Sequence, residues 1–222
     1  MDFRHEIKHE INLSDMFEIR QRLKAVAFSD PHAIDGKYVI RSLYFDNIYD
    51  KALMEKVNGL SWREKFRIRY YNGDTSVIHL EKKSKIDHLG NKQSAPLTKE
   101  EAQSIVDGDT EWMSESEFPV IRELFTKMKI QGLKPRTIVD YTREPFIFPA
   151  GNVRVTLDYN IRSGMYCTDF LNPDCVTMPV SEAIVLEVKW DGFLPDIIRD
   201  AVSLTDRCEG AFSKYEACRI FG

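Results

Sequence analysis

Apolar and charged residues alternate along much of the chain, and the alternation is clearest in residues 62–71. Successive side chains of a β-strand point to opposite faces, so this period of two predicts a strand. A strand with one apolar face usually turns that face to the core and leaves the polar face to water. The apolar face carries Trp62, Phe66, Ile68 and Tyr70 with Glu64 among them, and the opposite face carries Arg63, Lys65, Arg67, Arg69 and Tyr71.

The same period recurs in other segments and predicts seven or eight strands, nearly all antiparallel. Asn72-Gly73-Asp74 is typical of a hairpin turn, so residues 62–71 and 76–85 should be neighbours in the sheet. Each strand carries charges on one face and apolar residues on the other. The remaining strands are expected at 4–12, 37–45, 136–148, 153–161 and 182–190.

Helical spacing of apolar residues and capping residues predict helices between these strands. Residues 86–135 break the strand rhythm, and we expect a helical insertion around 95–130 within the sheet domain, because neither of its helices could bury its apolar stripe alone. Residues 1–222 are therefore expected to form a single domain. The expected helices run from a cap at Ser14 or Asp15 to Val26, over 49–57, from a cap at Thr98, over 119–129 ending near Gly132, and over 194–204.

Composition limits the class of protein. The chain has 222 residues, of which 43% are hydrophobic, so a substantial core can form. The net charge is only −4, so an anion site would have to arise from local sorting of the 31 lysine and arginine residues. The N-terminus lacks a signal-peptide pattern, and no apolar run approaches the roughly 20 residues of a membrane span. We expect a soluble, cytoplasmic protein without a membrane segment.

The four cysteines do not point to a metal site. Cys167, Cys175, Cys208 and Cys218 show neither CxxC nor zinc-ligand spacing. They are interpreted as reduced thiols, and the sequence alone leaves a disulfide open.

The charged faces allow two architectures. On an open sheet they would lie in water, with cross-strand ion pairs. In a closed barrel they would line the interior, and burying so many cations is costly unless water or a polyanion enters. Three Glu-x-Lys pairs favour the second, because carboxylates held among phosphate-binding cations suit a Mg²⁺ or Mn²⁺ site. These pairs are Glu6 with Lys8, Glu81 with Lys83, and Glu187 with Lys189.

Eight short motifs follow one another along the chain: Glu6-Ile-Lys8, Arg41-Ser-Leu-Tyr-Phe-Asp46, Phe66-Arg-Ile-Arg69-Tyr, Leu80-Glu-Lys-Lys83, Asp140-Tyr-Thr-Arg143, Val153-Arg-Val-Thr-Leu-Asp158, Leu186-Glu-Val-Lys189 and Phe212-Ser-Lys-Tyr215. In this order they resemble the VTC domain, the polyphosphate polymerase domain of the triphosphate tunnel metalloenzyme superfamily, which also includes the CYTH proteins. The resemblance runs from residue 3 to about residue 220.

The resemblance implies an α+β fold: an eight-stranded antiparallel β-barrel, the triphosphate tunnel, with helices packed outside. It also implies basic residues that grip a polyphosphate and a glutamate-bound Mn²⁺ or Mg²⁺. Eukaryotic relatives attach an SPX domain and membrane helices, and we expect neither here. By motif position, the phosphate ligands would be Lys8, Arg67, Arg69, Lys83, Arg143, Arg154, Lys189 and Lys214, and the metal ligands Glu187 and, more weakly, Glu6 and Glu81.

The function implied by the resemblance is transfer of the γ-phosphoryl group of a nucleoside triphosphate to a polyphosphate chain. Such a reaction needs alignment and charge neutralisation more than covalent chemistry from the protein. The catalytic residues would be Arg67, Arg69, Lys83 and Glu187.

Two alternatives stay open beside this reading. Hydrolysis of tripolyphosphate or nucleoside triphosphate would use the same site with water as acceptor. A polyphosphate-binding module would bind without turnover. A nucleic-acid partner is not expected, because Trp62, Phe66 and Tyr70 lie on the face opposite the arginines, whereas stacking and phosphate contacts need one surface.

Clustered arginines also give an expectation about stability. If Arg67 and Arg69 lie in a closed tunnel, they repel each other and their basic neighbours when no anion is bound, so the protein without ligand would store electrostatic strain. Replacing either with alanine would then leave the fold equally stable or slightly more stable.

Overall fold

Eight antiparallel strands form one sheet in the computed structural model, which describes residues 4–86, 89–204, 210 and 212–220. Their order is β1-β10-β8-β7-β3-β4-β5-β6, and two short strands lie off this path, with β2 pairing with β7 and β9 with β8. The bounds are β1 His5–Ile11, β2 Phe28–Ser29, β3 Tyr38–Asp46, β4 Trp62–Tyr71, β5 Asp74–Ile86, β6 Leu89–Leu97, β7 Lys134–Phe148, β8 Val153–Ser163, β9 Met178–Ser181 and β10 Ile184–Trp190.

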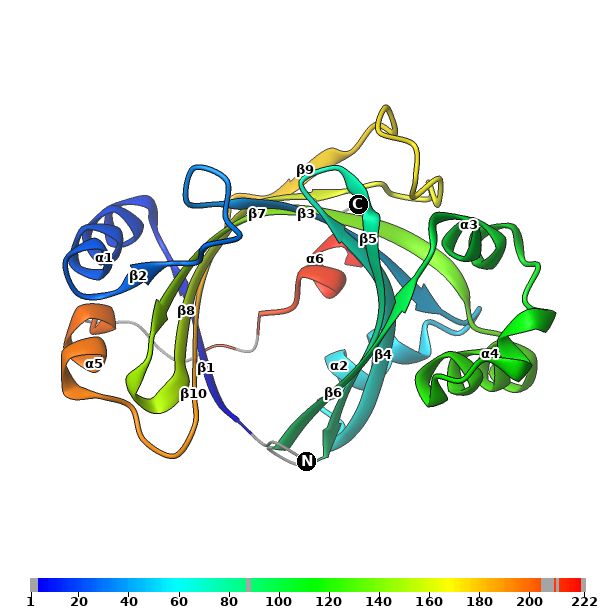
Figure 1. Ribbon diagram of the computed structural model, residues 1–222, viewed down its shortest axis with the longest axis horizontal. Helices are drawn as coiled ribbons and strands as arrows, with labels where there is room; N and C mark the ends of the chain where they lie inside the picture. The colour runs from blue at the N-terminus through cyan, green and yellow to red at the C-terminus, as the bar shows by residue number, and fades with distance from the viewer. Residues whose placement is uncertain (1–3, 87–88, 205–209, 211, 221–222) are drawn as a thin grey trace.

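The sheet curls until its two ends approach each other. Lys83 on β5 and Glu6 on β1 lie near opposite ends of the strand order, yet Lys83 Nζ is 3.3 Å from Glu6 Oε2. The face that carries these two side chains must therefore be the concave one. Figure 1 shows the resulting half-barrel, with β1 and β6 at its edges. The predicted α+β class and the eight-stranded antiparallel sheet are confirmed.

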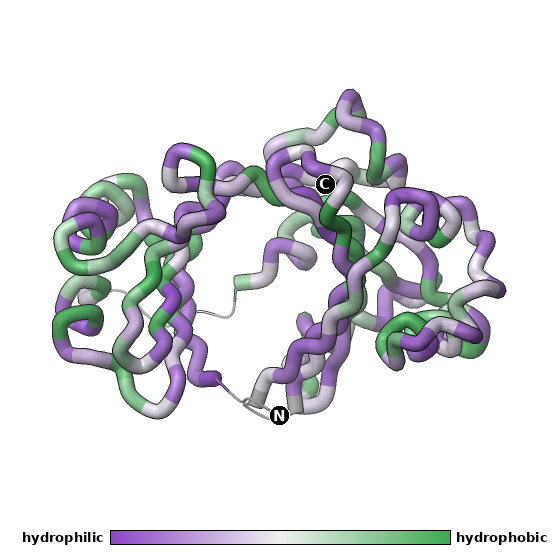
Figure 2. The backbone as a smooth tube through the Cα atoms, in the orientation of Figure 1, coloured by the Kyte–Doolittle hydropathy of each residue, from purple (hydrophilic) through white to green (hydrophobic). Residues whose placement is uncertain are grey.

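The convex face is covered by helices at both ends of the half-barrel (Figure 1). On one side α1 (Leu13–Val26) and α5 (Asp196–Val202) share a core with the apolar faces of β8 and β10. On the other side α3 (Lys99–Asp107), the 3₁₀ turn η1 (Glu111–Glu115) and α4 (Pro119–Gln131) pack against β4 and β5. Figure 2 shows purple and green alternating along the strands, as expected when one face is charged and the other lies in these cores.

A third core lies on the concave side. It includes Tyr44 of β3, Tyr141 of β7 and Tyr215 of α6 (Lys214–Ile220), and the rings of Tyr44 and Tyr215 stack with centroids 4.9 Å apart. Helix α2 (Lys51–Val57) contributes Ala52 to the same core. Figure 1 shows α6 within the arch of the sheet, so one helix fills part of the space that the charged faces surround.

The helix boundaries follow capping chemistry. Thr98 caps α3 as predicted, because its side chain accepts from the Glu101 N–H while Glu101 accepts from the Thr98 N–H at 2.8 Å. The predicted cap of α1 at Ser14 or Asp15 was wrong by two or three residues. Asn12 forms the cap, since its Oδ1 accepts from Asp15 N–H at 2.8 Å and Asp15 returns the bond. Gly132 ends α4 with a φ of 68°, as its position predicted.

The Asn72-Gly73 turn joins β4 and β5 as predicted, with φ values of 53° and 74°. β6 was not predicted, because residues 90–94 are polar or glycine and Pro96 interrupts the pattern. Proline is tolerated in β6 because that strand is at the edge of the sheet. β2, β9 and α6 were also missed, being too short to show a period.

Over the part of the chain that the structure describes, no helix is long and apolar enough to cross a membrane.

Candidate functional site

Two glutamates and three lysines meet on the concave face where β1 and β10 approach β5; we call them the Glu6 cluster. The antiparallel register sets Glu6 opposite Lys189 and Lys8 opposite Glu187. Glu6 accepts from Lys8 at 2.7 Å, from Lys189 at 3.2 Å and from Lys83 at 3.3 Å. Glu187 pairs with Lys189 and lies 3.8 Å from Lys8 Nζ. Three ammonium groups thus surround two carboxylates.

The Glu6 cluster shifts the titration of its own members. Burial and Glu187 raise the pKa of Glu6, but Lys83, Lys8 and Lys189 outweigh them and lower it to about 2. Burial raises the pKa of Glu187 too, yet Lys189 and Lys8 hold it well below its usual range. Desolvation, Lys8 and Lys189 lower the pKa of Lys83 to about 8, against the opposing effect of Glu6. Both carboxylates are therefore ionised at neutral pH.

A second group, the Glu81 cluster, lies on β4, β5 and β6. Arg67 donates from Nε to Glu81 Oε2 at 2.8 Å and from Nη1 to the Tyr44 hydroxyl at 2.7 Å. Arg69 Nη1 is 3.6 Å from the same Glu81 oxygen, and Lys92 Nζ is 2.5 Å from the other. Glu81 is only 3% exposed; burial raises its pKa, but Arg67, Arg69 and Lys92 together lower it far more.

A third group, the Asp158 cluster, joins β7, β8 and α6. Arg143 grips the fully buried Asp158 through two hydrogen bonds of 2.6 and 2.7 Å, and Lys214 Nζ donates to the same carboxylate at 2.6 Å. Lys214 also lies 4.7 Å above the Tyr141 ring. Arg69 donates to the Tyr141 hydroxyl at 3.0 Å, which connects this cluster with the Glu81 cluster.

Of the residues predicted as phosphate ligands, seven belong to these three clusters. The eighth, Arg154, pairs with Asp30 at 3.0 Å near the β2–β3 connection. Arg154 keeps its predicted face of β8, opposite Lys189 in the register, but its contact is with a different carboxylate.

The expectation of stored repulsion between Arg67 and Arg69 rested on a wrong premise. Both guanidinium groups share Glu81, so the site without ligand already has counter-charge. A buried carboxylate that loses one of its cationic partners becomes costly. Removal of either arginine should therefore destabilise the fold, the opposite of the sequence-based expectation.

The predicted metal ligands separate into two places. Glu6 and Glu187 are close enough that Glu187 raises the pKa of Glu6, whereas Glu81 sits in the other cluster with its own cations. Within the described residues, no three His, Cys, Asp or Glu side chains gather into a metal-binding group. Mg²⁺ is commonly held by one or two carboxylates plus substrate phosphates and water. The Glu6–Glu187 pair fits such a site, and Glu81 does not join it.

Sequence reasoning missed several residues that the structure places at the site. Asp158 and the hydroxyls of Tyr44 and Tyr141 orient the arginines, and Lys92 completes the Glu81 cluster. Asp158 shares a strand face with Arg154, which was a usable signal. Lys92 could not be found, because β6 itself was missed.

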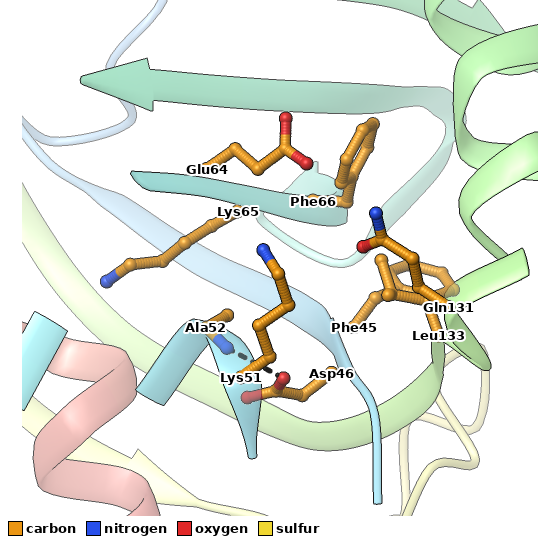
Figure 3. A pocket seen from close by; sticks show the side chains of 9 residues that line it. All are labelled: Phe45, Asp46, Lys51, Ala52, Glu64, Lys65, Phe66, Gln131 and Leu133. Carbon is orange, nitrogen blue, oxygen red and sulfur yellow. Dashed lines mark hydrogen bonds between the residues drawn. The ribbon is translucent and has the colours of Figure 1, made fainter. Parts of the chain in front are cut away.

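A small pocket lies between α2, β4 and the end of α4 (Figure 3), and no member of the three clusters lines it. Figure 3 shows Lys65 leaving β4 on the side opposite Glu64 and Phe66. Asp46 accepts from Ala52 N–H at 2.9 Å and from the Tyr215 hydroxyl at 2.6 Å, so it ties α2 and α6 to β3. The lining residues are Phe45, Asp46, Lys51, Ala52, Glu64, Lys65, Phe66, Gln131 and Leu133.

Three of the four cysteines lie within the residues that the structure describes. Cys167 and Cys175, in the β8–β9 connection, are free thiols with their Sγ atoms 2.8 Å apart, and Cys218 is buried in α6. Cys208 lies outside the described residues.

The comparison with protein families finds a match to the VTC domain over residues 3–220. No curated protein matches the sequence. The PH1819 protein of Pyrococcus horikoshii OT3 is 18% identical, with 90% of this chain and 84% of that chain covered and a TM-score of 0.45. The PH1012 protein of the same organism is 13% identical, with 91% and 92% covered and a TM-score of 0.47. A Bacillus halodurans protein provisionally assigned as an adenylate cyclase is 12% identical, with 85% and 80% covered and a TM-score of 0.48.

Proposed function

This chain belongs to the VTC domain family, and we propose that it is a metal-dependent phosphotransferase that moves the γ-phosphoryl group of a nucleoside triphosphate to a polyphosphate chain. The observation that carries the proposal is the sorting of charge. A chain with a net charge of −4 gathers Lys8, Lys83 and Lys189 around Glu6 and Glu187 on one concave face. That face continues through the Glu81 and Asp158 clusters.

The arginines suit phosphate recognition. A guanidinium group has five N–H donors in a planar fork, and phosphate oxygens can take two of them at once. Arg143 uses Nε and Nη2 on Asp158, which leaves its Nη1 hydrogens to donate elsewhere. Arg67 is similarly fixed by Glu81 and Tyr44. The carboxylates therefore hold the arginines in place before the substrate binds, which reduces the ordering cost of binding.

The chemical step requires little else from the protein. Phosphoryl transfer depends on aligning donor and acceptor and on neutralising charge over the transferred group. The terminal phosphate of a polyphosphate is already ionised, so no strong general base is needed. Lys8, Lys83 and Lys189 would neutralise phosphate oxygens near Glu6 and Glu187. These two carboxylates would hold Mn²⁺ or Mg²⁺, which would supply further positive charge at the triphosphate.

The test is incubation of the protein with ATP and Mn²⁺ or Mg²⁺, with and without a short polyphosphate primer, followed by sizing of the products on a gel. Growth of chains, with ADP released in step, supports the proposal. Release of orthophosphate from ATP or tripolyphosphate without chain growth would contradict the proposal and indicate hydrolysis in the same site. Saturable binding of polyphosphate without turnover would leave only a binding role. Glu187→Gln is the inactive control, and Glu18→Gln on the exposed surface of α1 is the matched active one.

A further inference from the structure

Lys65 shares the concave side of β4 with Arg67 and Arg69 but differs from them in its partners. Its Nζ donates to Ser213 Oγ at 3.1 Å and lies 5.5 Å from the Tyr215 ring centroid. Over the described ranges 4–86, 89–204, 210 and 212–220, Lys65 forms no ion pair with a carboxylate. Each of the eight predicted phosphate ligands does form one, with Glu6, Glu81, Asp158, Glu187 or Asp30.

The surroundings of Lys65 are positive. The register of β4 and β5 places Lys83 directly opposite. Desolvation, Lys83, Lys56 and Arg63 lower the pKa of Lys65 to about 8, against the opposing effect of Tyr44. An ammonium group that is desolvated and has cations as neighbours is stabilised by an anion that binds from outside the protein.

Ser213 supplies a second donor at the same point. Its Oγ accepts from Lys65 and, at 3.3 Å, from the backbone N–H of Glu216. Since a hydroxyl accepts and donates, its own hydrogen can point to a third group. Lys214, the next residue, donates to Asp158 on β8. The start of α6 thus connects the β4 wall with the β8 wall and presents Ser213 between them.

We propose that Lys65 Nζ and the Ser213 hydroxyl together bind one phosphate group of the substrate chain, at a position additional to the eight predicted cations. The identification of the anion as a phosphate rests on the proposed function. Two residues of a strand span about 6.4–6.8 Å, so Lys65 and Arg67 would hold different phosphates of one chain. An incoming phosphate meets no competing carboxylate among the described residues at Lys65, whereas at Arg67 it must share the guanidinium group with Glu81.

The test is calorimetric titration of the protein with tripolyphosphate and with pyrophosphate, without nucleotide and without metal. We expect Lys65→Met to weaken tripolyphosphate binding at least about tenfold, and pyrophosphate binding less, because a shorter anion can be held by the remaining cations. Lys65→Arg should keep most of the affinity, and Ser213→Ala should lose about threefold. Lys24→Met is the charge-matched control, because Lys24 is exposed on α1, on the convex side.

Thermal melts of the same variants without ligand separate binding from folding. Lys65→Met should melt no lower than wild type, since it removes a cation that lacks a carboxylate partner. Equal tripolyphosphate affinity in wild type and Lys65→Met, or no binding by the wild type, would overturn the inference. Neither result depends on turnover, so a protein that binds through Lys65 but builds no polymer would refute the proposed function alone. A polymerase whose Lys65→Met variant binds normally would refute this inference alone.

Discussion

Lys83 and Glu6 join strands near opposite ends of the sheet order, with Lys83 Nζ 3.3 Å from Glu6 Oε2. β1 and β6 are not paired with each other along that order, so this ion pair spans the seam of the half-barrel. Glu6 also holds Lys8 and Lys189, which makes it the residue that brings the β1–β10 edge toward β5. Closure of the fold and assembly of the Glu6 cluster therefore depend on the same carboxylate.

The first prediction concerns acid stability. The pKa of Glu6 is about 2 in the folded protein and about 4.5 when unfolded, so the stability it contributes is present above about pH 4.5 and is lost as pH falls through 2. We expect the loss of these ion pairs to lower the free energy of unfolding by about 1–2 kcal/mol, because Glu6 is partly exposed and water screens its charge. Denaturant unfolding between pH 6 and pH 2 should show a shallower decline in Glu6→Gln than in wild type. Glu10→Gln, at an exposed position of the same strand, should keep the wild-type slope; equal slopes in all three proteins would contradict the assignment.

The second prediction separates metal binding from phosphate binding. Glu187→Gln keeps the shape of the side chain but removes the charge that a divalent cation requires. We expect metal-dependent turnover to fall at least about a hundredfold, with a much smaller change in tripolyphosphate affinity, because Lys8, Lys83 and Lys189 remain. Turnover at saturating Mn²⁺ and calorimetric titration without metal are the two measurements. Full activity of Glu187→Gln would remove this residue from the proposed role.

The period of two along the strands was sufficient to predict which residues share the concave face. Glu64 and Phe66 lie on the convex side and Arg67 on the concave side, as the alternation required. The alternation could not predict which side chains of distant strands come into contact, because that depends on how far the sheet curls. The Lys83–Glu6 contact is such a case. The neutralisation of Arg67 and Arg69 by Glu81 could not be predicted either. It depends on the register between β4 and β5, and a different register would have placed Glu81 elsewhere.

Short elements were the other limit. β6 carries Lys92 to Glu81, but its glycine, proline and polar residues give no period. α6 spans only seven residues, and it is held in the arch by the Tyr215–Asp46 hydrogen bond and the Tyr215–Tyr44 stack. Both β6 and α6 depend on tertiary contacts for their formation, and a local sequence pattern does not contain such contacts.

The third prediction reverses the sequence-based expectation for the arginines. Arg67→Ala leaves Glu81 buried with Arg69 and Lys92 as its remaining partners, so we expect the protein without ligand to lose about 1–3 kcal/mol of unfolding free energy. The stabilisation by tripolyphosphate should fall as well. Chemical denaturation with and without tripolyphosphate measures both. Arg22→Ala, whose partner Glu18 is on the exposed surface of α1, should change stability by less than about 1 kcal/mol.

The fourth prediction tests the hydrogen bond that anchors α6. Tyr215→Phe removes only the hydroxyl that donates to Asp46, and Asp46 keeps its bonds to the backbone of Asn47 and Ala52. We expect a loss of about 1 kcal/mol in unfolding free energy. We also expect weaker tripolyphosphate binding, because Lys214 begins the same helix. Tyr166→Phe, at an exposed tyrosine, is the control. A change in stability with unaltered affinity would show that α6 does not position Lys214.

The last prediction concerns alkaline pH, where the site and the fold should respond in opposite directions. Lys65 and Lys83 have pKa values of about 8 in the folded protein, below the 10.5 of an unperturbed lysine. Between pH 8 and 10.5 the unfolded chain binds more protons at these residues than the folded chain, so their contribution to unfolding free energy rises with pH. Tripolyphosphate needs the charged ammonium groups, so its affinity should fall over the same range.

Melting temperature without ligand and the dissociation constant for tripolyphosphate, measured on one preparation from pH 7 to pH 9.5, test both halves of this prediction. In Lys24→Met both curves should follow wild type. In Lys65→Met or Lys83→Met each curve should be flatter, because one of the two titrating ammonium groups is gone, and the affinity at pH 7 should already be reduced. The ionisation of tripolyphosphate itself is common to all four proteins, so the differences between them report on the lysines. An affinity that falls equally steeply in every variant would mean that neither Lys65 nor Lys83 loses its proton within reach of the phosphate chain.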